Sequence, residues 1–165
     1  MAVNESTTVN APIDRVVEAF ASEEFARFVC EKMGIGFEGF ALSGETSAAY
    51  TATTQRTVSA DRVPDIAKKF VSKGVQMTQT DNVSAPAADN SRTVETDIQV
   101  SGMPISASAS QSLVPQGENT VINVSGEVKC GIPLVGKKIA SAAEPYVGEV
   151  MTRLGSYVEE WLAKN

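Results

Sequence analysis

Apolar and polar residues alternate along this chain from about residue 75 to residue 128. The clearest run has Val94, Ile98 and Val100 on one parity and charged or amide side chains on the other. A period of two is typical of a β-strand with one dry face and one wet face. The short connections at 101–104 and 115–119 favour antiparallel neighbours. The pattern therefore predicts four successive strands arranged as a meander.

Three more strands are predicted before residue 75. Residues 3–9 are rich in β-branched side chains and suit an opening strand. Residues 35–42 and 46–58 suit a hairpin, joined by the polar, glycine-containing connection at 43–45. The whole chain therefore predicts seven strands.

Short helices are predicted between these strands. Pro12 fits the first helical position, where its missing N–H costs nothing. Ser22 is placed to cap a second helix, and Gly34 is placed to end it in a left-handed conformation. The same start and stop signals predict a third helix between Pro64 and Gly74.

The chain after residue 133 has the period of a helix. Its main apolar stripe consists of Ile139, Ala143, Val147, Val150, Leu154, Tyr157 and Trp161. A second stripe runs through Gly148, Met151 and Gly155, so that either backbones approach closely at its glycines or space remains there. Pro145 predicts a kink, or a main helix that begins near Glu144.

Together these elements predict one α+β domain over residues 1–165, without internal repeats or linkers. A curved seven-stranded antiparallel sheet must cover its dry face, and only the terminal helix is long enough to do so. One helix is too narrow to seal so wide a sheet, and Ala107 and Ala109 at mid-face are small. We therefore expect an internal cavity. The alternative is that large neighbours such as Phe40 and Trp161 fill it.

Composition and charge narrow the class of partner. The chain is 42% hydrophobic, but its apolar runs are far shorter than the roughly 20 residues that cross a bilayer, so we expect no stable membrane insertion. The net charge of −6 repels phosphate backbones and argues against nucleic acid. The first residues lack a basic start followed by an apolar block, which predicts a cytoplasmic location.

The chemistry available to the chain is limited by the absence of histidine. Ser-His-Asp and Cys-His nucleophiles and most zinc sites need an imidazole. Cys30 and Cys130 read as reduced thiols, and the scattered carboxylates lack the spacing of a calcium loop. We predict no metal, no cofactor and no assigned catalytic residue. The polar residues expected to face inward are Arg56, Gln79, Asp81 and Gln111, with Tyr50 and Tyr146.

Several segments resemble a known family. The order of elements and the segment Val9–Val16 resemble the START-like superfamily, which has the helix-grip fold and includes birch-pollen-allergen relatives, lipid-transfer domains and polyketide cyclases. Residues 58–71, 126–129 and 132–139, above all the run Ile-Pro-Leu-Val-Gly, resemble an actinobacterial family of unknown function (2505) within that superfamily. The resemblance implies the helix-grip fold and a ligand cavity, but no reaction.

The leading hypothesis is a domain that binds a hydrophobic or amphipathic small molecule, such as a lipid or polyketide-like compound, for transport or sequestration. We expect the lining to consist of Tyr50, Met77, Val94, Ile98, Ile105, Ile122, Val147 and Met151. Gln111 or Arg56 would fix a polar head. The alternatives are a cyclase or hydrolase of the same fold, and an interaction domain with a filled core. The oligomeric state is left open.

Overall fold

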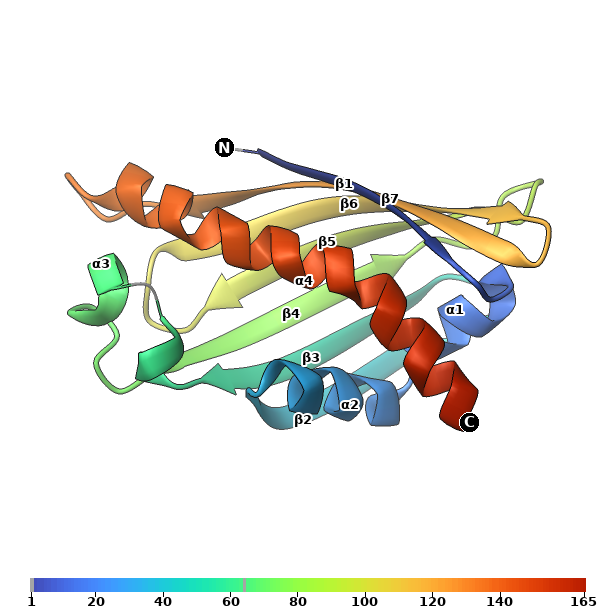
Figure 1. Cartoon of the computed structure of the whole chain (residues 1–165), viewed down its shortest axis with the longest axis horizontal. Helices are drawn as coiled ribbons and strands as arrows, with labels where there is room; N and C mark the ends of the chain where they lie inside the picture. Colours follow the sequence, from blue (N-terminus) through green and yellow to red (C-terminus); the bar gives the residue numbers. More distant parts are fainter. Residues whose placement is uncertain (1, 64) are drawn as a thin grey trace.

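The computed structural model describes residues 2–63 and 65–165, so the predicted role of Pro64 in opening a helix lies outside the described residues. The elements follow one another along the chain as in Figure 1. They are β1 (Ala2–Val9), α1 (Ile13–Phe20), α2 (Glu23–Met33), β2 (Gly36–Gly44), β3 (Tyr50–Val58), the 3-10 turn η1 (Ala60–Arg62), α3 (Asp65–Lys68), β4 (Val75–Val83), β5 (Arg92–Val100), β6 (Ile105–Gln116), β7 (Asn119–Cys130) and α4 (Gly136–Lys164).

The strands of the described chain form one seven-stranded antiparallel sheet in the order β1-β7-β6-β5-β4-β3-β2. Strands β2 to β7 are therefore a meander, and the alternating pattern predicted this arrangement for the last four of them, β4 to β7. Strand β1 closes the far edge beside β7, where Val9 pairs with Thr120. Thr120 is fully buried and donates its hydroxyl to the carbonyl of Ala11 at 2.8 Å. This bond ties the start of the helical segment to the sheet.

The ends of α1 and α2 follow from local residue chemistry. Ser22 accepts a hydrogen bond from the N–H of Phe25 at 3.3 Å, and Gly34 has a φ of 69°, which confirms both predicted helix boundaries. Pro12 is extended and stands just before α1, one position earlier than predicted. The ring of Phe25 lies 5.5 Å from that of Trp161, so α2 packs against the end of α4.

The hairpin between β2 and β3 differs from the sequence prediction. Its connection is 45–49, not 43–45, and β3 begins only at Tyr50. The reason is Arg92, whose buried guanidinium donates to the carbonyls of Thr46, Ala48 and Ser84. These carbonyls are satisfied by a distant side chain, so this loop does not need to continue the strand pairing.

Two helix predictions also need correction. Helix α3 is only Asp65–Lys68, because the next N–H groups, of Phe70 and Val71, bond to carbonyls three residues back in tight turns. Helix α4 begins at Gly136 and continues through Pro145, so a start near Glu144 is wrong. Ile139, ahead of Pro145, is 3% exposed, and this packing stabilises the first turns of α4.

Helix α4 crosses the concave face of the sheet diagonally and packs mainly on β1 and β7 (Figure 1). Burial on that face is uneven. At the end that carries α1, called here the α1 end, Tyr50 and Leu113 are buried. At the opposite end, which carries α3 and is called the α3 end, Met77 and Ile98 remain partly exposed. The hydrophobic core therefore sits at the α1 end, and the α3 end of the concave face is only half covered.

Candidate functional site

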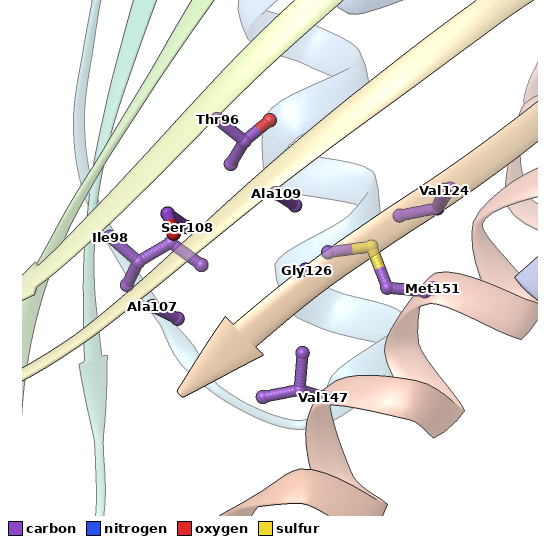
Figure 2. A pocket seen from close by; sticks show the side chains of 9 residues that line it. All are labelled: Thr96, Ile98, Ala107, Ser108, Ala109, Val124, Gly126, Val147 and Met151. Carbon is purple, nitrogen blue, oxygen red and sulfur yellow. The ribbon is translucent and has the colours of Figure 1, made fainter. Parts of the chain in front are cut away.

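A small apolar pocket separates α4 from the middle of the sheet (Figure 2). Its walls are Thr96 and Ile98 of β5, Ala107, Ser108 and Ala109 of β6, Val124 and Gly126 of β7, and Val147 and Met151 of α4. The volume of the pocket is about 10 Å³, which is close to the space that one water molecule needs. The enclosed space is therefore much smaller than a ligand-sized cavity.

The pocket is small because two helix side chains occupy the space that the small sheet residues leave. Figure 2 shows Val147 and Met151 reaching from α4 toward the sheet, over Ala107, Ala109 and Gly126. A Cβ at Gly126 would lie 2.6 Å from the carbonyl oxygen of Ser108, so this position of β7 has no room for a side chain. Met151 is an unbranched, adaptable side chain, and it closes the pocket without fixing its shape.

Beside the pocket, a row of hydrogen-bonded polar side chains crosses the concave face from β3 to β6. Arg56 Nη1 donates to Gln79 Oε1 at 2.5 Å, and Gln79 Nε2 donates to Asp81 Oδ2 at 2.9 Å. Thr96 Oγ1 lies 2.6 Å from Asp81 Oδ1, and Gln111 Nε2 lies 3.3 Å from Thr96 Oγ1. We call these five residues the polar row. The row brings together four of the inward polar residues that the sequence predicted.

The direction of each hydrogen bond in the polar row is determined by the number of protons available. An ionised Asp81 can only accept, so the single hydroxyl proton of Thr96 points to it. The Thr96 oxygen must then accept, which orients the Gln111 amide with its N–H toward Thr96 and its oxygen away. Gln111 is 5% exposed, and its Oε1 accepts no hydrogen bond from any described residue. The row thus ends in a buried acceptor without a partner.

The other end of the row carries a positive charge. Arg56 is partly exposed at the α3 end, yet its Nε atom is buried and donates to none of the described residues. Burial raises the pKa of the Asp81 carboxyl, and the hydrogen bonds from Thr96 and Gln79 and the charge of Arg56 oppose that shift. The concave face therefore holds a cation and a partly desolvated carboxyl group, joined through Gln79.

The remaining predicted lining residues lie at different depths. Tyr50, Val94 and Ile122 are part of the packed core at the α1 end. Tyr50 donates its hydroxyl to the carbonyl of Val17 at 2.8 Å, and burial raises the pKa of its phenol. Ile98, Val147 and Met151 line the small pocket, whereas Met77 and Ile105 are half-buried toward the α3 end. Tyr146 is 53% exposed and stands apart from the polar row.

Sequence reasoning missed three residues that shape this region. Thr96 links Asp81 to Gln111, but in the sequence it reads as one more β-branched residue on the dry face. In the sequence Arg92 resembles an exposed charged residue at the end of a strand, but in the structure it is only 6% exposed. Glu144 lies on the α4 stripe that contains Val147 and Met151, and its Oε1 is buried and meets no donor among the described residues. Only its three-residue spacing from Val147 could have indicated an inward position.

Comparison with known proteins settles the family. A family described as "Protein of unknown function (DUF2505)" matches residues 4–162. The chain belongs to this family. A search of curated proteins found no match. Among the residues that the structure describes, no helix is long and apolar enough to cross a membrane, and no group of three or more His, Cys, Asp or Glu side chains is arranged to hold a metal ion.

Solved structures with the same fold match nearly the whole length of the chain. Protein TTHA0849 of Thermus thermophilus has a TM-score of 0.60 at 14% identity, with 97% of this chain and 95% of that chain covered. A START superfamily protein from Mycobacterium smegmatis has a TM-score of 0.57 at 15% identity, covering 99% and 97%. A point mutant of norcoclaurine synthase from Thalictrum flavum, in complex with a transition-state analogue, has a TM-score of 0.52 at 12% identity, covering 99% and 94%. The fold is therefore the helix-grip fold of the START-like superfamily, as the sequence resemblance implied.

Proposed function

We propose that this protein binds an amphipathic small molecule on the concave face of the sheet, beneath α4. The observation that carries the proposal is the buried Oε1 of Gln111, an acceptor without a protein donor, held in place by Thr96. An unpaired buried acceptor is costly, and a ligand hydroxyl or amine would remove that cost. The ligand class is therefore a lipid or polyketide-like compound that carries a hydrogen-bond donor.

The apolar part of such a ligand would lie along the side chains between the polar row and α4. Ile98, Ala107 and Val147 offer it dispersion contacts beside the pocket, and Met77 and Ile105 extend the apolar surface toward the α3 end. Arg56 would hold an acidic or carbonyl-bearing end of the ligand there. The predicted deep residues Tyr50, Val94 and Ile122 would contact only a ligand that reaches into the core.

Ligand entry requires movement, because the pocket has room for only about one water molecule. Met151 can change rotamer at little cost, and Val147 lies on the half of α4 above the partly exposed surface. Outward displacement of this half would open the face from the α3 end while the core at the α1 end stays packed. Transport or sequestration of the ligand in the cytoplasm is the corresponding cellular role.

Native mass spectrometry of protein purified from its source organism tests the proposal. We expect a retained compound, and a rise in melting temperature with fatty acids, fatty alcohols or hydroxylated aromatic compounds. Ala107→Met fills the pocket and should abolish both effects, whereas Ser106→Met, on the opposite face of β6, should leave them unchanged. If nothing is retained and no compound in the panel raises the melting temperature, the proposal is wrong and the interaction domain with a filled core replaces it.

An enzyme of the same fold is the second candidate, and Asp81 is the observation that favours it. A carboxyl group whose pKa is raised by burial, on a ligand-facing surface, keeps its proton to higher pH than an ordinary aspartate and could donate it to a ligand. Both oxygens of Asp81, however, already accept hydrogen bonds from Gln79 or Thr96, which suits an anchor for the polar row better than a proton carrier. Turnover of the retained compound, lost in Asp81→Asn, would favour the enzyme.

A further inference from the structure

The loop between β7 and α4 exposes a leucine in an unfavourable backbone conformation. Leu134 is fully exposed, with a relative exposure of 101%, and its φ is 71°. Residues other than glycine rarely adopt positive φ, and asparagine tolerates it better than leucine does. The loop packs through Gly131, whose N–H donates to the carbonyl of Pro104 at 2.8 Å. The fold therefore presents the Leu134 side chain to the surroundings.

Strand pairing brings two other connections to the same end of the sheet. Cys130 at the end of β7 pairs with Ile105 at the start of β6, so the 101–104 turn lies beside the Leu134 loop. Val58 pairs with Val75, so the long connection from β3 to β4, which contains α3, emerges at this end as well. Figure 1 shows α3 and the first turns of α4 together at the left end of the molecule.

Two further apolar side chains are exposed at this α3 end. Phe70 follows α3 and is 36% exposed, and Tyr146 of α4 is 53% exposed. Helix α3 contacts α4, the helix that carries Tyr146. The ammonium of Lys69 lies 5.1 Å from the centre of the Phe70 ring. Exposed apolar groups thus alternate with lysines over this end.

Charge is distributed very unevenly between this end and the rest of the protein. Segments 59–76, 101–104 and 129–140 contain seven of the fourteen Lys and Arg residues but only two of the twenty Asp and Glu residues. Lys73, Lys137 and Lys138 are exposed and form no ion pair with any described residue. The α3 end is therefore basic, although the net charge of the whole chain is acidic.

We propose that the α3 end docks on an anionic lipid surface. We call Leu134, Phe70 and Tyr146, with Lys69, Lys73, Lys137 and Lys138, the docking surface. Its apolar side chains would enter the headgroup region while the lysines meet lipid phosphates, the combination by which proteins bind a membrane surface without crossing it. The inference is independent of the pocket and adds an interaction surface to the proposed function.

Vesicle sedimentation with the full chain tests the docking surface. The probes are phosphatidylcholine vesicles with and without about one third phosphatidylglycerol, at low and at physiological salt. We expect binding to the anionic vesicles only, weakened by salt. Lys137→Gln with Lys138→Gln should lower the partition coefficient about tenfold or more. Leu134→Asn should lower it roughly tenfold, because asparagine tolerates positive φ and removes the apolar group.

Matched controls separate docking from general loss of charge or folding. Arg15→Gln with Arg153→Gln removes the same charge from exposed helix positions, and Leu42→Thr removes an exposed leucine on β2. These variants, and the pocket-filling Ala107→Met, should bind vesicles like the wild type, and circular dichroism checks that all of them fold. Absent binding, equal binding to neutral vesicles, or equal losses in the controls would overturn the proposal. A dimer that Leu134→Asn dissociates, with no vesicle binding, would instead assign this surface to a second copy of the chain.

Discussion

The hydroxyl oxygen of Thr96 lies 2.6 Å from Oδ1 of Asp81, across the β4–β5 strand pair. This contact joins the charged half of the polar row, which contains Arg56 and Gln79, to the neutral half, which ends at Gln111. The hydroxyl of Thr96 has one proton and donates it in the hydrogen bond to Asp81. The orientation of the Gln111 amide therefore depends on the charge state of Asp81. That charge state determines whether the oxygen or the N–H groups of the Gln111 amide point away from Thr96.

Asp81 should make stability depend on pH in a direction opposite to that of a salt-bridged carboxylate. Burial raises its pKa above the ordinary value of 3.8, so the native state binds the proton more tightly than the unfolded state does. Its contribution is fully present below pH 3.8 and is lost as the pH rises through the raised pKa. We expect the wild type to lose stability relative to Asp81→Asn over this window. Urea unfolding from about pH 4 to pH 8 measures the difference, and a constant or growing wild-type advantage would contradict the raised pKa.

Gln111→Leu should separate stability from binding. Leucine has a similar size and removes a buried acceptor that lacks a partner, and Thr96 keeps its bond to Asp81. The free energy of unfolding should stay the same or rise by about 1 kcal/mol, while affinity for the retained compound falls roughly tenfold. Urea unfolding and ligand titration measure the two effects. Gln55→Leu, at an exposed site on β3, is the control and should change neither the free energy of unfolding nor the ligand affinity. If Gln111→Leu binds the compound as tightly as the wild type, Gln111 does not hold the polar head of the ligand.

Arg92→Met should destabilise the hairpin connection at 45–49. The substitution keeps much of the apolar stem but leaves the carbonyls of Thr46, Ala48 and Ser84 without their donor. Removing the charged donor of these three part-buried hydrogen bonds costs about 2–3 kcal/mol in total. Hydrogen exchange should accelerate around residues 45–49, and Arg15→Met, at an exposed position, should cost less than about 0.5 kcal/mol. An equal effect at Arg15 would show that Arg92 has no special role.

Gly126→Ala should destabilise the sheet where it forms the pocket wall. The new methyl group would lie 2.6 Å from the backbone oxygen of Ser108, which cannot rotate away as a flexible side chain could. We expect a loss of about 1–3 kcal/mol in urea unfolding. Gly39→Ala is a matched strand control, since its Cβ would meet only Gln55 Oε1 at an ordinary 3.6 Å. A neutral Gly126→Ala would mean that β6 and β7 can separate at this point.

Local chemistry in the sequence determined the order and type of nearly every element. Period-two alternation gave strands β4 to β7, and Ser22 and Gly34 gave the boundaries of α2, because these signals act between residues close in the chain. Strand parity predicted that Arg56, Gln79, Asp81 and Gln111 lie on the inward face, where the polar row is found. Parity assigns a face, however, and cannot say which side chains on that face meet.

Only the tertiary structure decided the contacts between distant segments. Arg92 holds the hairpin connection although it lies 46 residues from Thr46 along the chain, and Met151 closes a pocket that small sheet residues would have left open. Lysines from two connections that are far apart in the chain lie at one end of the sheet. The net charge of −6 does not indicate this basic end. The physical reason is that pairing register and helix packing bring together groups whose separation along the chain carries no local signal.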